Sequence, residues 1–154
     1  MEYHADVEIN APAACVWEVL ADFAAYPEWN SFMKIIGKPV VGSRVKASYQ
    51  TDGLGRMVTN MRATVLGCET DRHLRWAGFM WVPSWFEVDH SFRIQTIGTN
   101  RSYFIQRIAF TGSLIPFVIP FLESSLRRGL KEMSQALKER AESETGVKIR
   151  VPQR

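Results

Sequence analysis

The strongest constraint on the fold is a long apolar stripe near the end of the chain. At every third or fourth position the residue is apolar or small: Leu122, Leu126, Gly129, Leu130, Met133, Leu137 and Ala141. This spacing predicts one face of a helix of about six turns, roughly 30 Å long at 1.5 Å per residue. A helix this long must bury such a face, so the rest of the chain has to provide a broad apolar surface.

Alternating apolar and polar residues predict that this surface is a sheet. One alternating segment covers residues 2–9, and further segments follow between about 33 and 110. Short turns between successive segments predict an antiparallel sheet with one face in water. Pro12 is expected to start a short helix after the first strand, and Pro27 marks a second helical turn. Pro120 is expected to lie in the first turn of the long helix.

Length, charge and motifs exclude several classes of protein. A chain of 154 residues with 46% hydrophobic residues predicts one domain, which we place at 1–146 and follow with a flexible basic tail at 147–154. Acids and bases are mixed along 121–144 and the net charge is only +3, so we expect no nucleic-acid binding. The sequence has no GxSxG, HExxH or CxxC motif, and we predict neither a metal nor another cofactor.

The N-terminal residues and the cysteines bear on the compartment. The first ten residues lack the basic and apolar regions of a signal peptide, and Cys15 and Cys68 are far apart. We therefore expect a cytoplasmic protein with two free thiols, either a monomer or a homodimer. The most apolar run, 114–122, is about half as long as the roughly 20 residues that span a bilayer. It is either a pocket lid, a peripheral membrane contact, a dimer patch or a buried approach to the long helix.

The predicted inward faces are rich in aromatic side chains and poor in groups for polar catalysis. The whole chain has 9 Phe, 5 Trp and 4 Tyr, but only 3 His. By alternation, the polar side chains that point inward include His90 and Gln106. The candidate ligand-binding residues are Trp29, Tyr49, Met61, Trp76, His90, Phe92, Phe104, Gln106, Gly129 and Met133.

Several of these candidates have a structural interpretation beside the functional one. His90 is either a core histidine hydrogen-bonded to the backbone or to Gln106, a polar ligand contact, or a general base that titrates near neutral pH. Gln106 orients a ligand oxygen or is a satisfied core amide. Gly129 either allows a close approach to the sheet or leaves room for a ligand. Trp29 and the nearby Phe32 either staple the helical turn or line the pocket.

The order of these elements resembles that of the START-related SRPBCC superfamily, the pollen-allergen-like group of polyketide cyclases/dehydratases and lipid-transport proteins. The stretches that carry the resemblance are VEINAPAACVWEVLADFAAYPEWNSF (7–32), LRWAGF (74–79), HSF (90–92), FTGSLIPF (110–117) and RRGLKEMSQALKERAE (127–142). The resemblance implies a helix-grip fold, with a seven-stranded antiparallel sheet around the long C-terminal helix, two short helices after strand 1, and a deep apolar cavity inside. This chain departs from the pattern at two places. Similar sequences often have acidic residues where this chain has Ile108 and Ala109, and Asn where it has Ser134.

Two functions follow as expectations. The first is binding or transport of a hydrophobic small molecule, such as a lipid, an isoprenoid or a polyketide, in the internal cavity. The alternative is an enzyme of the polyketide cyclase/dehydratase type, with His90 as general base and Tyr49 or Gln106 as hydrogen-bond donor to an enolate. No inward carboxylate is predicted beside His90, so we favour binding. A protein-interaction module with an incidental cavity is a third alternative.

Overall fold

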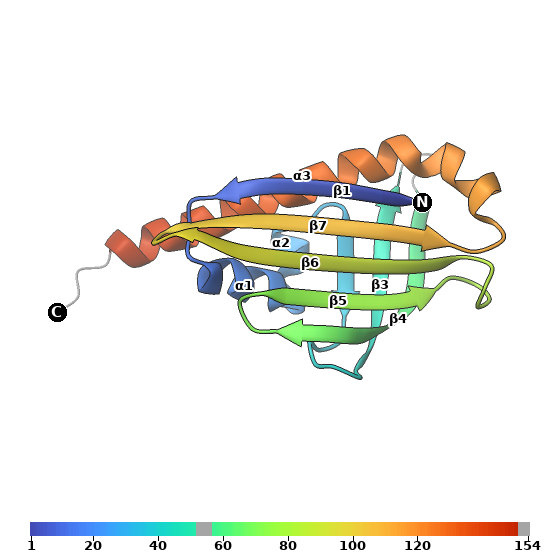
Figure 1. Ribbon diagram of the computed structural model, residues 1–154, viewed down its shortest axis with the longest axis horizontal. Helices are drawn as coiled ribbons and strands as arrows, with labels where there is room; N and C mark the ends of the chain where they lie inside the picture. The colour runs from blue at the N-terminus through green and yellow to red at the C-terminus, as the bar shows by residue number, and fades with distance from the viewer. Residues whose placement is uncertain (52–56, 151–154) are drawn as a thin grey trace.

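A curved antiparallel sheet and one long helix make up most of the molecule (Figure 1). The computed structural model describes the backbone of residues 1–51 and 57–150, and their side chains except those of 57–59 and 147–150. Within these ranges the strands are β1 (Glu2–Ile9), β2 (Met33–Ile36), β3 (Arg44–Thr51), β4 (Met57–Glu69), β5 (His73–Phe79), β6 (Glu87–Gly98) and β7 (Arg101–Thr111). The helices are α1 (Ala13–Ala21), a 3-10 turn (Phe23–Ala25), α2 (Tyr26–Trp29) and α3 (Ile115–Arg150).

The strands follow the order β1-β7-β6-β5-β4-β3-β2, and every neighbouring pair is antiparallel. Each hairpin therefore joins strands that are adjacent in the sequence, and β1 closes the sheet against the last strand. The register pairs Trp76 with His90 across β5 and β6, and Phe92 with Gln106 across β6 and β7. The middle of the sheet thus brings these four side chains together on one face, as alternation predicts.

The long helix packs its predicted stripe against the concave side of the sheet. Figure 1 shows α3 running along the sheet beside β1, with α1 and α2 on the same side. Its buried apolar residues include Leu122, Leu126, Leu130, Met133, Leu137 and Ala141. The predicted α+β class and the helix that the sheet encloses are therefore confirmed.

The start of the long helix was predicted wrongly. α3 begins at Ile115, and Pro120 lies inside it instead of in its first turn. The carbonyl of Leu114 already accepts hydrogen bonds from the N–H groups of Phe117 and Val118, so the first turn is complete before Pro120. Pro120 lacks the N–H that would donate to the carbonyl of Pro116, and the loss of this one helical bond close to the helix start is tolerated.

The far end of α3 and one hairpin bear on two other predictions. α3 continues to Arg150, past the domain boundary predicted at 146. The flexible tail predicted at 147–154 stays a prediction, because residues 151–154 lie outside the described residues. The turn expected at Asp52-Gly53 also lies outside them.

Candidate functional site

The inward polar side chains form a chain of hydrogen bonds in the middle of the core. The Nε1–H of Trp76 donates to the hydroxyl oxygen of Tyr49 at 3.3 Å. That hydroxyl lies 3.0 Å from Nδ1 of His90, whose Nε2 lies 3.2 Å from Oε1 of Gln106. All four side chains are buried. The strands β3, β5, β6 and β7 each contribute one of them, so the chain crosses most of the sheet.

The series of hydrogen bonds ends on α3, and the contacts at this end determine which nitrogen of the imidazole carries the proton. Nε2 of Gln106 donates to the carbonyl of Leu130 at 2.8 Å and to Oγ of Ser134 at 2.6 Å. A carbonyl only accepts, so the amide NH2 faces α3 and Oε1 of Gln106 faces His90. Nε2 of His90 then carries the proton, and Nδ1 accepts the hydroxyl proton of Tyr49. The bonds all donate in the same direction, and such aligned bonds strengthen one another.

Burial keeps the hydrogen-bonded side chains of His90 and Tyr49 uncharged. Desolvation lowers the pKa of His90 to about 4, although the hydrogen bond to Gln106 and the charge of Asp89 act in the opposite direction. Desolvation also raises the pKa of Tyr49 well above its usual value. At neutral pH the imidazole and the phenol are both neutral, and the one free lone pair of His90 is occupied by Tyr49. This geometry favours the core-histidine interpretation over that of a general base.

Aromatic rings surround the polar chain. The ring of Phe92 lies 4.3 Å from that of His90, 5.0 Å from that of Trp76 and 6.0 Å from that of Phe104, measured between centroids. Met61 on β4 and Met133 on α3 are buried in the same core. The candidates from the strands, together with Met133, are thus brought into one interior.

Trp29 lies apart from this interior cluster. Its ring contacts Tyr26 at 5.0 Å between centroids, and it lines a hollow of about 180 Å³ together with Asp22, Arg140 and other residues. Trp29, the last residue of α2, therefore packs at the edge of the core through its contact with Tyr26.

Gly129 faces a side chain that sequence reasoning did not pair with it. A Cβ atom at Gly129 would lie 2.1 Å from Cδ2 of Phe32, so the ring occupies the place of a side chain on α3. Phe32 is only 2% exposed, and its ring meets that of Tyr49 edge-on at 5.5 Å. On the outer side lies a hollow of about 180 Å³, lined by Phe32, Gly129, Gln50, Ser125 and neighbouring residues. Phe32 thus separates this hollow from the polar chain, and Gly129 allows the close approach.

Gly129→Ala is expected to lower the free energy of unfolding by about 1–2 kcal/mol. Overpacking against Phe32 costs about 1–3 kcal/mol, and the better helix propensity of alanine returns up to about 1 kcal/mol. Urea denaturation measures the difference. Gly146→Ala is the matched control, because no atom lies within 4 Å of its added Cβ, and it is expected to be neutral or stabilising. Equal stability of the two variants would contradict the contact, and Phe32→Leu is expected to rescue Gly129→Ala.

Among the described residues, the four side chains of the polar chain are at most 5% exposed. Three hollows of about 520–990 Å³ lie instead on the outside of the molecule, among exposed residues such as Arg62 and Arg93. Among the described residues there is no group of three or more His, Cys, Asp or Glu side chains placed to hold a metal ion. The deep cavity that the resemblance implies therefore requires side chains to move, and Phe32 is the side chain between the interior and an outer hollow.

Comparisons with known proteins agree with this architecture. The family described as polyketide cyclase/dehydrase and lipid transport matches residues 2–142. The chain is similar to the crystal structure of the ZhuI aromatase/cyclase from Streptomyces sp. R1128, with a TM-score of 0.78, 18% identity, and coverage of 94% of this chain and 95% of that one.

Two further structures share the fold. A START superfamily protein from Mycobacterium smegmatis has a TM-score of 0.68 at 17% identity. The alignment covers 93% of this chain and 98% of that protein's chain. Norcoclaurine synthase from Thalictrum flavum has a TM-score of 0.69 at 11% identity, with 94% and 96% covered. No curated protein matches the sequence. The helix-grip fold predicted above is confirmed, and at these identities the likeness shows the fold alone.

Proposed function

Because this chain belongs to the polyketide cyclase/dehydrase and lipid transport family, we propose that it binds a hydrophobic small molecule between the sheet and α3. The observation that carries the proposal is a buried aromatic interior crossed by the hydrogen-bonded side chains of Tyr49, His90 and Gln106. Apolar walls hold a ligand by burial, and a few fixed polar groups orient it. A lipid, an isoprenoid or a polyketide has the required apolar body and polar end.

Phe32 is the proposed entry point for the ligand. The N–H groups of Phe32 and Met33 both donate to Oδ1 of Asn30, at 3.1 and 3.0 Å, so the backbone there is held and opening requires only a rotamer change of the packed ring. Gly129 presents no side chain on the opposite wall. Rotation of one ring therefore joins the outer hollow to Tyr49, whose hydroxyl is then available to a ligand oxygen in place of His90.

The energetics set what such a ligand must provide. Burying about 300 Å² of apolar ligand surface gives roughly 7.5 kcal/mol at about 25 cal/mol per Å². Association removes at least about 4 kcal/mol of this. Micromolar affinity therefore requires either more burial or a hydrogen bond, and Tyr49 and Gln106 are placed to make one.

The second candidate function is a cyclase or dehydratase that uses His90 as general base. His90 and Tyr49 are adjacent, as a base and a hydrogen-bond donor need to be. The low pKa of His90 makes its imidazole a weak base, and no buried Asp or Glu among the described residues is hydrogen-bonded to it. These features favour binding over catalysis. Turnover of a poly-β-keto substrate by wild type, lost in His90→Ala while binding remains, would instead favour the enzyme.

A thermal-shift panel of lipids, isoprenoids and aromatic polyketides tests the binding function. A ligand present at 100 times its Kd stabilises the chain by about 2.7 kcal/mol, which raises Tm by roughly 5–10 °C. Phe32→Ala is expected to bind the same compound faster, whereas Phe117→Ala, at an exposed position, is expected to behave as wild type. The proposal fails when no compound shifts the Tm of wild type or of Phe32→Ala.

The setting proposed for this function is the cytoplasm, with the chain as a monomer or a homodimer.

The run 114–122 forms the start of α3 and has two different sides. Ile115, Ile119 and Leu122 are buried, whereas Phe117 and Phe121 are exposed. The buried side supports the interpretation as an approach to the helix, and the exposed side remains available for a membrane or a second copy.

A further inference from the structure

We propose that one end of this protein docks on an anionic membrane surface. Exposed aromatic side chains would enter the headgroup region, and a neighbouring basic strand face would lie against the anionic lipids. The inference rests on the proposed function and deepens it, because it names a bilayer as the place where the hydrophobic ligand is collected or delivered.

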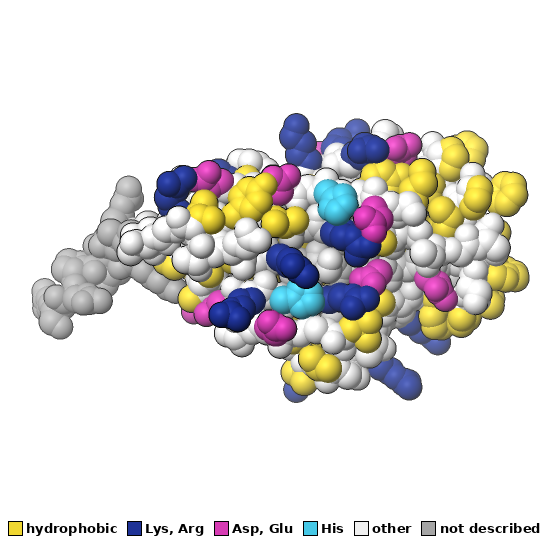
Figure 2. All heavy atoms as spheres, in the orientation of Figure 1, with side chains coloured by type: hydrophobic (Ala, Val, Ile, Leu, Met, Phe, Trp, Pro, Cys, Tyr) yellow, Lys and Arg dark blue, Asp and Glu magenta, His cyan; other side chains and the backbone are white. Residues whose placement is uncertain are grey.

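Two segments form an exposed apolar end, which we call the apolar tip. It comprises five residues that are between 42% and 72% exposed: Trp81, Val82, Trp85, Phe117 and Phe121. Figure 2 shows hydrophobic side chains gathered at the end of the molecule where Figure 1 places the β5–β6 connection and the start of α3. Contiguous exposed apolar groups of this kind mark interaction sites in soluble proteins.

The backbone holds the two segments of the apolar tip together. The N–H of Ser113 donates to the carbonyl of Ser84 at 3.1 Å, and that of Leu114 to the carbonyl of Trp85 at 3.0 Å. Gly112 has φ +127°, and a Cβ there would lie 2.3 Å from the carbonyl oxygen of Trp85, so only glycine allows this approach. The apolar tip is therefore one preformed surface.

The segments of the apolar tip contain no charged residue, since neither 79–86 nor 112–122 includes Asp, Glu, Lys or Arg. The acids that follow them are engaged within the protein. Glu87 accepts a hydrogen bond from the N–H of Ser84, and Glu123 accepts one from Arg127. The residues of the tip itself can therefore enter an apolar phase without carrying a charge, while Glu87 and Glu123 stay at its border.

A cluster of cations lies on the outer face of β2, β3 and β4, and we call it the basic face. Its members are the exposed Lys34, Arg44, Lys46 and Arg62. Lys46 lies directly opposite Arg62 in the register, an arrangement that destabilises a sheet unless an anion compensates it. No ion pair joins these four residues to any acid among the described residues.

The other half of the same outer face has the opposite character. Three of the four arginines on these strands are paired with acids on neighbouring strands: Arg75 with Asp89, Arg101 with Glu8, and Arg107 with Glu2. Arg93 on β6 is exposed and has no ion pair among the described residues, so this half carries one uncompensated cation against four on β2–β4. This segregation of charge indicates an anionic partner for the basic face.

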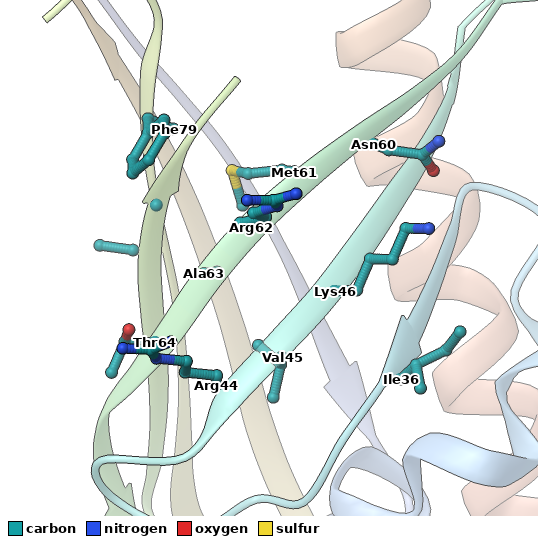
Figure 3. A pocket seen from close by; sticks show the side chains of 12 residues that line it. Ile36, Arg44, Val45, Lys46, Asn60, Met61, Arg62, Ala63, Thr64 and Phe79 are labelled. Carbon is teal, nitrogen blue, oxygen red and sulfur yellow. The ribbon is translucent and has the colours of Figure 1, made fainter. Parts of the chain in front are cut away.

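The basic face borders the apolar tip. Arg62 is the cross-strand partner of the half-buried Phe79, which precedes Trp81 by two residues. Figure 3 shows Arg62, Lys46 and Phe79 around an outer hollow of about 990 Å³. Trp and Phe favour the headgroup region of bilayers, and cations favour anionic lipids. A second copy of the chain fits less well, because a two-fold contact would bring two basic faces together.

The contact is peripheral in this proposal. Among the residues that the structure describes, no helix is both long and apolar enough to cross a bilayer. The apolar tip instead matches the partial insertion of aromatic side chains at an interface, which charge attraction reinforces.

Co-sedimentation of the full chain with vesicles tests the proposal. The lipids are phosphatidylcholine alone, or phosphatidylcholine with one third phosphatidylglycerol, and we expect at least tenfold tighter binding to the mixed vesicles. Phe117→Ser/Phe121→Ser is expected to reduce binding to the mixed vesicles at least tenfold. Lys46→Glu/Arg62→Glu is expected to remove the preference for anionic vesicles. Each of the two cations is expected to contribute roughly fivefold or more to the affinity for these vesicles.

Two variants outside the proposed surface serve as controls. Ile97→Ser changes a 45% exposed apolar residue near the other end of β6, and Arg93→Glu changes an exposed arginine on that strand. Both are expected to bind vesicles as wild type does. Equal losses in the controls, or no binding to mixed vesicles, would overturn the proposal. A wild-type dimer that Phe117→Ser/Phe121→Ser converts to monomer without changing vesicle binding would also overturn it, in favour of a second copy.

The outcomes separate this inference from the function on which it rests. When a soluble ligand raises the Tm of wild type and of Phe117→Ser/Phe121→Ser alike, but no vesicle binds, only the membrane inference fails. When vesicles bind as described but no compound of the panel raises Tm, the docking surface stands and the interior function fails.

Discussion

Trp76→Ala is expected to lower the free energy of unfolding by about 3–5 kcal/mol, the usual range for removing a fully buried aromatic side chain. Trp76 is 0% exposed, and its ring contacts those of Phe23, His90 and Phe92 at 5.0–5.9 Å between centroids. The substitution also removes the N–H that donates to Tyr49. Denaturation in urea or guanidinium measures the loss.

Two variants separate the contributions of Trp76. Trp76→Phe keeps most of the ring area and removes the N–H donor, so a loss of about 1 kcal/mol is expected. Trp85→Ala removes an exposed tryptophan and is expected to change stability by no more than about 0.5 kcal/mol. A loss below about 1 kcal/mol for Trp76→Ala would contradict the close packing described here, because it would mean that open space already surrounds the ring.

The second large effect is a loss of stability in acid that depends on His90. The pKa of His90 is about 4 in the folded protein, because burial disfavours the imidazolium, against 6.5 when exposed. Between these values the unfolded state binds a proton that the folded state does not, so stability falls as the pH decreases from about 6.5 to about 4. The full difference is about 3 kcal/mol, at 1.36 kcal/mol for each pKa unit.

Denaturation of wild type and of His90→Gln at a series of pH values tests this linkage. The difference in the free energy of unfolding between the two chains is expected to shrink by about 3 kcal/mol across that window, since glutamine does not titrate. His4→Gln, at an exposed histidine, is expected to follow wild type at every pH. A parallel pH dependence of wild type and His90→Gln would show that His90 has the same pKa in the folded and unfolded chain, which would contradict the lowering of its pKa by burial.

Alternation was sufficient to place the interior side chains. Tyr49, Trp76, His90 and Gln106 each follow from the apolar neighbours two residues away, because successive strand residues point to opposite faces whatever the register. The same reasoning offered Gln106, beside a backbone group, as a hydrogen-bond partner of His90 in the core-histidine interpretation, and the structure contains the bond to Gln106. The apolar stripe from Leu122 to Ala141 predicted the helix around which the strands close.

Contacts between distant segments could not be predicted in this way. The pairing of Trp76 with His90 depends on the β5–β6 register, which alternation leaves open. The contact of Phe32 with Gly129 joins residues almost a hundred positions apart, and its only signal was a glycine in the middle of an apolar helical stripe. The apolar tip depends on backbone hydrogen bonds between a turn and a helix start, so the run 114–122 alone could not reveal it.

Native mass spectrometry of the purified chain, followed by organic extraction, tests most directly the central claim that a hydrophobic molecule binds inside this fold. We predict that part of the chain carries one apolar molecule with a polar end, and that adding the extracted molecule back raises Tm. A native spectrum with the mass of the chain alone, together with no extractable apolar molecule and no stabilisation of wild type or Phe32→Ala by the panel, would contradict the claim.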